Sequence, residues 1–199
     1  DAWPAAFYTQ SLPRATVFYN LGIGGETTAA ALSDELPRAL QLRPTLATVW
    51  LNVDDLGAGV TVADYESQLT TLVRSLRQGG RTRVFVANTP VLDSLPLVRF
   101  CLGEGPPPSN SDGGCPISLP GGVQLTRALL DTSVAAYNQA IGRVVTAEGA
   151  VLVDLHAQGD VAGAHPDYVD REDGFHPSDR GHAAIAAAFA SALRGAGGI

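Results

Sequence analysis

The order of apolar runs along the chain constrains the fold more than any other feature of the sequence. Four short runs are rich in aliphatic, aromatic and β-branched residues, and they alternate with segments of helical spacing: residues 15–21, 46–51, 84–88 and 151–155. Strands that are apolar throughout and alternate with helices are typical of a parallel sheet covered on both faces. We therefore predict one α/β sandwich domain that spans residues 1–199.

The segments between the apolar runs predict the helices. Residues 65–77 place leucine and valine on one helical face and end before Gly79-Gly80. A helix that begins at Thr27 or Thr28 and extends to about Leu42 must be kinked or divided at Pro37. Three further helices are expected: an N-terminal one around Trp3, Phe7 and Tyr8, one over residues 124–148, and one over residues 179–194 capped by Ser178.

The composition and the lengths of the apolar runs argue against nucleic-acid binding and against a membrane-spanning segment. The 199 residues are 45% hydrophobic and 17% charged, which is typical of a globular domain. The formal net charge of −7 argues against nucleic acid, because no basic stripe is present to neutralise phosphates. No apolar run approaches the roughly 20 residues that a transmembrane helix needs, so no membrane-spanning segment is predicted.

The two cysteines, Cys101 and Cys115, flank a stretch rich in glycine, proline and serine. We expect a disulfide that closes this loop, within an insertion over residues 91–123. In the chain-entropy model such a bridge stabilises the fold by about 3 kcal/mol. A disulfide indicates an oxidising compartment, so the predicted location is secreted or periplasmic. Two cysteines are too few for a structural zinc site, and no metal is expected.

Polar residues gather where the predicted strands end. Gly24-Gly25 follows the first run, residues 52–54 follow the second, and residues 173–176 lie in the loop after the fourth. Ligands of parallel α/β sheets bind at the carboxyl ends of the strands. We therefore expect these three polar groups to lie at one edge of the sheet, where the 90–120 loop also begins.

The segment Asp173-Gly174-Phe175-His176-Pro177 has the chemistry of two-thirds of a hydrolytic triad. Asp173 can accept a hydrogen bond from one ring nitrogen of His176 while the other nitrogen faces a nucleophile. An aspartate three residues before a histidine is more often an ordinary surface turn. The interpretation therefore depends on the rest of the chain.

These motifs together resemble those of the SGNH (GDSL-type) serine hydrolases, which include esterases and lipases. Residues 20–28 resemble the second block of that family, and Gly25 matches its oxyanion-binding glycine. Residues 49–55 resemble the third block, which places its oxyanion asparagine at Asp54. Residues 173–177 match the fifth block, with Asp173 and His176 as acid and base. The resemblance implies a three-layer sandwich on a flavodoxin-like parallel sheet, and hydrolysis of small-molecule or lipid esters without a cofactor.

One departure from the family pattern concerns the oxyanion hole. Asp54 stands where the family has an asparagine, and a carboxylate there would repel the developing oxyanion. Losing one such donor typically costs on the order of 10²–10³ in rate. Two alternatives stay open. Burial could keep Asp54 protonated, or Asn52, two residues earlier, could replace the missing donor in part.

A second departure is that the opening Gly-Asp-Ser block is absent. Ser11, Ser33 and Ser178 are better interpreted as loop, helix-surface and helix-capping residues. The missing strand would occupy an inner position between the first two strands seen here, and an empty slot would expose unpaired backbone groups. The chain also contains no methionine. We therefore expect a separate N-terminal segment, a nicked fragment or a partner strand to complete the sheet and to supply the serine.

Two functions other than ester hydrolysis are also considered from the sequence. A catalytically inactive relative could keep the fold as a binding or scaffold protein after losing the serine and the oxyanion asparagine. A calcium-dependent carbohydrate-binding domain could use the acidic group Asp167, Asp170, Glu172 and Asp173, although the spacing lacks an ordered calcium-loop signature. His182 is interpreted as a helix-surface or packing histidine on the last helix.

Overall fold

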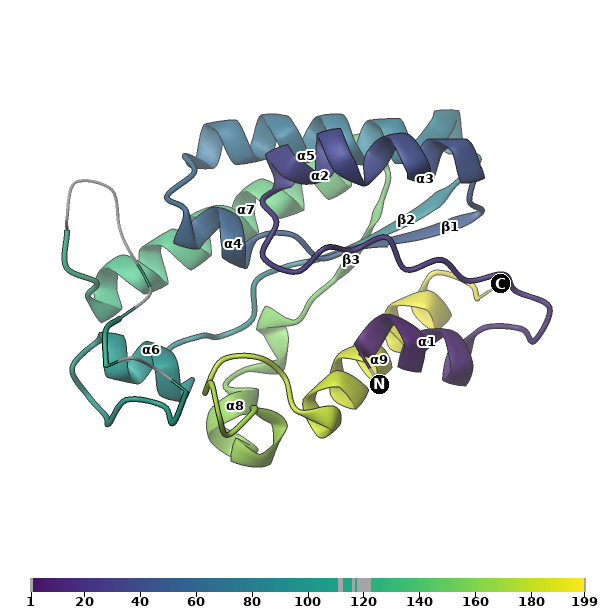
Figure 1. The fold of residues 1–199 in the computed structure, drawn as a ribbon. Helices are drawn as coiled ribbons and strands as arrows, with labels where there is room; N and C mark the ends of the chain where they lie inside the picture. Colours follow the sequence, from purple (N-terminus) through teal and green to yellow (C-terminus); the bar gives the residue numbers. More distant parts are fainter. Residues whose placement is uncertain (1, 111–112, 116, 118–122, 199) are drawn as a thin grey trace. The chain divides into compact units, whose positions relative to one another are not determined.

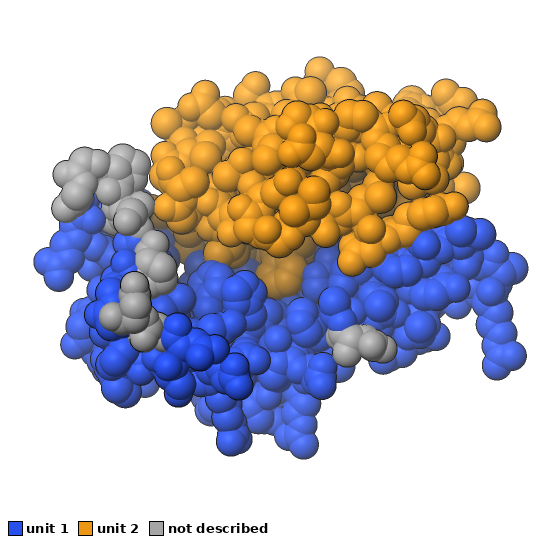
Figure 2. All heavy atoms as spheres, in the orientation of Figure 1, with its two compact units in different colours: residues 1–18, 90–132, 155–199 blue, residues 19–89, 133–154 orange. Residues whose placement is uncertain are grey.

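The computed structural model describes residues 2–110, 113–115, 117 and 123–198. The chain forms two compact units, each made of segments that are far apart in the sequence (Figure 2). Unit 1 contains residues 1–18, 90–132 and 155–199, and unit 2 contains residues 19–89 and 133–154.

Unit 2 contains the sheet. Among the described residues three parallel strands pair in the order β1-β2-β3: β1 (Leu46–Val49), β2 (Arg83–Ala87) and β3 (Val151–Val153). The central strand β2 is the most buried, as four of its five residues are inaccessible to solvent. The first three residues of β1 are half-buried, in keeping with its position at the edge. The prediction of a mixed α/β fold with a parallel sheet is confirmed.

The helices of unit 2 follow local sequence signals. The predicted helix that Pro37 was expected to divide forms two helices, α2 (Thr28–Asp34) and α3 (Leu36–Leu42), with the proline in the first turn of α3. The side chain of Thr27 accepts a hydrogen bond from the N–H of Ala30 and caps α2. The short helix α4 (Val53–Gly57), which we did not predict, precedes α5 (Val62–Arg77).

The core of unit 2 lies between the sheet and two long helices. Helix α5 contributes buried Leu69 and Val73, and helix α7 (Arg127–Glu148) contributes Ile141 from its part in this unit. Tyr65 stacks on Tyr137 with ring centroids 4.5 Å apart. These contacts place α5 and α7 side by side over the sheet.

Unit 1 is built around α9 (Asp179–Gly195), which packs along α1 (Trp3–Ser11) (Figure 1). Trp3 stacks on Phe189 with ring centroids 4.2 Å apart, and the backbone N–H of Trp3 donates to Nδ1 of His182 at 3.2 Å. His182 is thus a packing residue, as predicted. The described residues of unit 1 also form several short elements: α6 (Pro96–Cys101), a 3₁₀ turn (His156–Gln158), α8 (Val161–Ala164) and a second 3₁₀ turn (Pro166–Tyr168).

The start of α9 is fixed by its cap and by a glycine. The side chain of Ser178 accepts a hydrogen bond from Gly181 N, which confirms it as the N-cap. A Cβ on Gly181 would lie 2.1 Å from the carbonyl oxygen of Tyr168, in the 3₁₀ turn Pro166–Tyr168. Only glycine therefore allows α9 to approach this turn so closely.

The prediction of a strand over residues 15–21 is wrong. These residues form no strand, and Val17 and Tyr19 are 73% and 55% exposed. A β-branched segment becomes a strand only when a neighbour supplies hydrogen-bond partners. Among the described residues no strand pairs with this segment, and the Thr16 carbonyl instead accepts from the Tyr8 hydroxyl at 3.1 Å, so composition alone could not make it a strand.

The predicted disulfide between Cys101 and Cys115 is present, with Cα atoms 5.1 Å apart. Several residues of the predicted 91–123 insertion lie outside the described residues, namely 111–112, 116 and 118–122. Within the described residues no helix combines the length and the apolar character needed to cross a membrane.

Candidate active site

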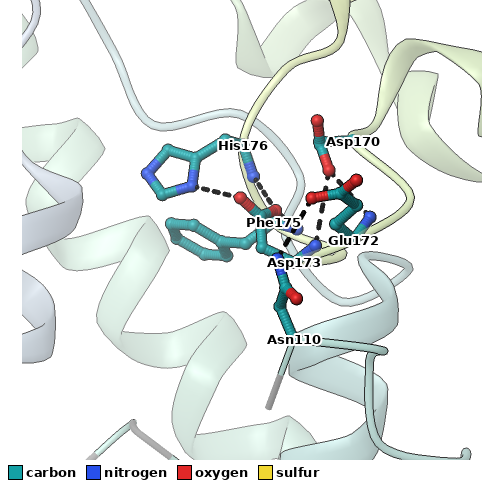
Figure 3. A network of polar contacts seen from close by, with 6 residues as sticks. All are labelled: Asn110, Asp170, Glu172, Asp173, Phe175 and His176. Atoms are coloured by element: carbon teal, nitrogen blue, oxygen red, sulfur yellow. Dashed lines mark hydrogen bonds and ion pairs between the residues drawn. The ribbon is translucent and has the colours of Figure 1, made fainter.

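The acid–base turn, residues 170–176 of unit 1, holds Asp173 against His176 (Figure 3). Oδ2 of Asp173 lies 2.8 Å from Nδ1 of His176. Oδ1 of the same carboxylate accepts hydrogen bonds from the backbone N–H groups of Phe175 at 2.8 Å and His176 at 2.9 Å. The two oxygens are thus divided between the turn and the imidazole, which fixes both side chains.

These contacts keep Asp173 ionised. Partial burial raises the pKa of the Asp173 carboxyl, but the N–H groups of Phe175 and His176 and the imidazole together outweigh it. The resulting pKa is below that of an ordinary aspartate. An ionised carboxylate can orient a histidine ring and stabilise it when it becomes protonated, as the triad aspartate does.

Asp170 closes the acid–base turn from the other end. Its N–H donates to the carbonyl of His176 at 2.8 Å, and its own carbonyl accepts from Gly174 N at 2.9 Å. Its carboxylate accepts from the N–H of Glu172 at 2.7 Å and from that of Asp173 at 3.4 Å. Four hydrogen bonds from one residue therefore define the turn that carries the acid and base.

The ring of His176 is available for chemistry. Its side chain is 73% exposed, and among the described residues the only hydrogen-bond partner of the ring is Asp173, at Nδ1. Nδ1 therefore donates to the carboxylate, and Nε2 is left as the basic nitrogen. A general base needs this arrangement.

The predicted oxyanion residues Gly25, Asn52 and Asp54 all lie in unit 2. Gly25 is exposed in the turn before α2, with φ of 83°, a conformation that favours glycine. Asp54 is exposed in the first turn of α4. The burial that would hold Asp54 protonated is therefore not observed in this structure.

Asn52 has a different environment from Asp54. It is 2% exposed, and its Nδ2 donates to the carbonyl of Ala87 at the end of β2, at 3.3 Å. One amide hydrogen of Asn52 is thus engaged in joining the turn after β1 to the neighbouring strand. Its role toward an oxyanion, like that of Asp54 and Gly25, stays a prediction.

Sequence reasoning missed Asp55, which ties the glycine turn to the Asn52–Asp54 turn. Its carboxylate is fully buried and accepts hydrogen bonds from both the N–H of Thr28, at 3.0 Å, and the Thr28 hydroxyl, at 2.9 Å. Burial raises the pKa of Asp55, while the Thr28 bonds lower it in part. A doubled acid in Asp54-Asp55 was the only available signal, and it does not reveal a partner 27 residues away.

Two tyrosine hydroxyls hold the ends of the segment 51–60, which contains the Asn52–Asp54 turn. The hydroxyl of Tyr65 donates to the carbonyl of Leu51 at 2.6 Å, and that of Tyr137 donates to the carbonyl of Val60 at 2.6 Å. Burial raises the pKa of both phenols above that of an ordinary tyrosine. They therefore remain neutral donors, and they fix residues 51–60 between α5 and α7.

A cavity of about 470 Å³ lies beside the acid–base turn in unit 1. Its wall combines apolar residues with Gly174 of the turn and three charged residues: Pro96, Pro108, Pro166, Val169, Gly174, Asp167, Asp170 and Arg171. This volume is in the range of about 300–1,000 Å³ that is common for small-molecule sites.

The acidic residues that suggested calcium are directed to separate partners. Asp167 pairs with Arg180 at 2.5 Å, and Glu172 accepts from Nδ2 of Asn110 at 3.1 Å. In the residues covered by the structure no three side chains of histidine, cysteine, aspartate or glutamate are grouped to hold a metal ion. This arrangement gives no support to a calcium site.

Comparison with solved structures identifies the class to which this architecture belongs. The chain superimposes on TesA with a TM-score of 0.68, at 17% identity over 98% of this chain and 88% of that chain. A catalytic mutant of the acetylxylan esterase Axe2 from Geobacillus stearothermophilus matches with a TM-score of 0.66 at 14% identity, over 99% and 81% of the two chains. The lipase/acylhydrolase from Enterococcus faecalis gives 0.59 at 18% identity, over 86% and 72%. At these identities the likeness shows the SGNH-hydrolase fold.

The sequence identifies the family. Residues 1–184 match the model of the GDSL-like lipase/acylhydrolase family, and the chain belongs to that family. Among curated proteins no sequence matches this chain.

Proposed function

We propose that this protein hydrolyses carboxylic esters with a Ser-His-Asp triad, in which Asp173 and His176 are the acid and base and the serine lies outside residues 1–199. The observation that carries the proposal is the 2.8 Å contact between Asp173 Oδ2 and His176 Nδ1 on an exposed ring. Membership of the GDSL-like lipase/acylhydrolase family supports the reaction class.

The proposed reaction has two half-reactions. In the first, Nε2 of His176 takes the serine proton while the serine oxygen attacks the ester carbonyl, and the protonated ring then gives that proton to the departing alcohol. In the second, His176 takes a proton from water as the water attacks the acyl-enzyme, and the protonated ring then returns that proton to the serine oxygen as the acid is released. Asp173 stays ionised throughout and orients the ring, which its lowered pKa favours. No metal or organic cofactor takes part in this scheme.

The hydrogen bonds of two serines within the chain, Ser178 and Ser33, support a nucleophile from elsewhere. The Ser178 hydroxyl donates to the carbonyl of Asp167 at 2.6 Å while it caps α9, and the Ser33 hydroxyl donates to the carbonyl of Ala30 at 2.9 Å. The sheet also has room for a strand, because among the described residues β1 pairs with β2 alone. A segment that paired with the other side of β1 would satisfy its backbone groups and could carry the serine.

The oxyanion is proposed to be held in unit 2. The N–H of Gly25 and the residue at the third-block position, Asp54 with help from Asn52, would face it together with the N–H of the serine. The Asp55–Thr28 bonds support this assignment, because they join the two turns that carry these groups.

The substrate is proposed to be a small-molecule or lipid ester. The cavity of about 470 Å³ beside the acid–base turn would hold its acyl or alcohol part, with Pro96 and Pro108 contributed by the disulfide-bearing segment. The disulfide supports a secreted or periplasmic location, because such bonds persist in oxidising compartments.

The test is ester hydrolysis by the full gene product and two histidine variants. With p-nitrophenyl acetate we expect His176→Ala to lower kcat/KM by at least 10³-fold, because the general base is lost. His165→Ala is the matched control, since His165 lies in the same unit and its ring stacks on Tyr168. Equal loss in both variants would argue against a specific role for His176.

A second candidate function is that of a binding or scaffold protein that has lost catalysis. The observation that favours it is the exposed carboxylate of Asp54 at the expected oxyanion position. It predicts that wild-type protein and His176→Ala show the same background hydrolysis, so the same assay separates the two candidates.

A further inference from the structure

The acid–base turn rests on a neighbouring segment of unit 1, residues 96–110, which we call the seat. The N–H of Leu97, in the first turn of α6, donates to the carbonyl of Gly174 at 3.1 Å. The N–H of Asn110 donates to the carbonyl of Glu172 at 2.9 Å, and its Nδ2 donates to Oε2 of Glu172 at 3.1 Å. Figure 3 shows Asn110 beside the turn. The seat therefore contacts the residues on both sides of Asp173.

Gly174 makes this contact possible. It is buried and has φ of 66°, and a Cβ placed on it would lie 2.9 Å from Cβ of Pro96, 3.1 Å from N of Leu97 and 3.2 Å from Cγ of Pro108. Two of these atoms belong to proline rings and one to the backbone, so they cannot rotate away as a flexible side chain would. Any side chain at position 174 would separate the turn from the seat.

The disulfide restricts the conformation of the seat. Pro108 and Asn110 lie inside the loop that Cys101–Cys115 closes, and Cys101 is the last residue of α6. Pro108 and Asn110 both contact the acid–base turn, and without the disulfide they would occupy these positions for a smaller fraction of the time. Closing the loop restricts the conformations that would carry Pro108 and Asn110 away from residues 172–174.

We propose that Gly174 is a positioning residue for the Asp173–His176 pair. Its missing side chain lets the acid–base turn lie on the disulfide-closed seat, which sets the orientation of the Asp173 carboxylate toward the histidine. The inference rests on the proposed function, in which this pair activates a serine. A misplacement of about 1 Å at a catalytic group can cost on the order of 10²-fold in rate, so a seat of this kind affects kcat.

The sharpest test compares two glycine-to-alanine variants. Gly174→Ala and Gly159→Ala both place an alanine at a positive φ, of 66° and 74°, and both lie in unit 1. Gly159 also has ψ of −157°, a region that is essentially restricted to glycine, so the backbone strain in the control is at least as great. A Cβ on Gly159 meets no atom within 4 Å, whereas one on Gly174 meets the seat. With p-nitrophenyl acetate we expect Gly174→Ala to lower kcat by about 10–100-fold with KM within twofold, and Gly159→Ala to stay within threefold of wild type.

Amide hydrogen exchange gives a readout that does not depend on activity. The N–H groups of Phe175 and His176 donate to Oδ1 of Asp173, and we expect both to exchange at least tenfold faster in Gly174→Ala, with no change in Gly159→Ala. Equal exchange and equal kcat in the two glycine variants would overturn the inference. Wild-type protein without esterase activity would instead overturn the proposed function, while faster exchange in Gly174→Ala would still support the seat.

A second pair of variants, with smaller changes, tests the inference even if Gly174→Ala does not fold. Asn110→Ala removes only the side-chain bond to Glu172, and we expect about threefold faster exchange of the Phe175 and His176 amides. Ser109→Ala changes an exposed neighbour in the same loop and should leave exchange unchanged. The same exchange rates in these two variants would show that the seat does not hold the turn.

Discussion

At the scale of single residues, the site depends on which oxygens and nitrogens remain available. Asp173 divides its two oxygens between the backbone of its own turn and the ring of His176. In unit 2 the buried carboxylate of Asp55 is engaged with Thr28, whereas Asp54 next to it is exposed. Adjacent aspartates of the same sequence motif therefore have different physical roles.

Asp54→Asn tests the predicted oxyanion position. An amide can donate a hydrogen bond to the oxyanion, and a carboxylate repels it, so we expect kcat for p-nitrophenyl acetate to rise at least tenfold. Asp131→Asn removes the same charge from another exposed position and is the control. An unchanged kcat in Asp54→Asn would remove this residue from the proposed oxyanion hole.

Asp55→Ala tests the link between the two turns of unit 2. The substitution leaves the N–H and hydroxyl of Thr28 buried without their acceptor, so we expect the free energy of unfolding to fall by about 2–3 kcal/mol. Urea denaturation measures this change, and Asp54→Ala at the exposed neighbouring position should cost well under half as much. Similar losses in both variants would contradict the structural role of Asp55.

At the scale of elements, helices α5 and α7 are joined at their surfaces by two ion pairs. Arg143 makes two contacts to Glu66, at 2.9 and 2.7 Å, and Arg74 makes two to Glu148, at 3.2 and 2.7 Å. Hydrogen bonds from the arginines lower the pKa of both glutamates. The folded state therefore binds fewer protons at these sites than the unfolded chain does.

This difference fixes the sign of a pH dependence. A lowered pKa contributes stability that is complete above the unfolded value near 4.5 and is lost as pH falls through the folded value. We expect the thermal midpoint of wild type, relative to Glu66→Gln/Glu148→Gln, to lose its advantage as pH is lowered from about 6 to 3. Thermal unfolding followed by circular dichroism measures it. A difference between the two proteins that does not change with pH would contradict the assignment.

Elements whose boundaries are set by local chemistry could be predicted from the sequence. Pro37 divides α2 from α3, and Ser178 caps α9, because proline geometry and capping act within a few residues. The segment 15–21 failed as a strand because pairing depends on a neighbour that its own sequence does not contain. Helix α4 was missed because its five residues carry no periodic pattern.

The site divides in the same way. The Asp173–His176 contact could be predicted, because the two residues are three positions apart in one turn. The hydrogen-bond partners of Tyr137 and Asp55 could not be predicted from the sequence. They lie 77 and 27 residues away along the chain, and no local pattern indicates them. The same holds for position 174, which requires glycine because Pro96 and Pro108 lie too close to accommodate a Cβ.

At the scale of the whole molecule, the chain has the fold and the family membership of GDSL-like lipases and acylhydrolases. The described part contains an oriented histidine and an open side of β1. The triad that we propose needs a serine at Nε2 of His176, and we propose that this serine lies outside residues 1–199.

The most direct test is to label the full gene product with a fluorophosphonate and to map the labelled peptide. Fluorophosphonates react with serines that a histidine activates, so we expect one labelled serine outside residues 1–199. Labelling should be lost in His176→Ala and retained in His165→Ala. A labelled serine within residues 1–199, or labelling that is equal in wild type and His176→Ala, would contradict the central claim.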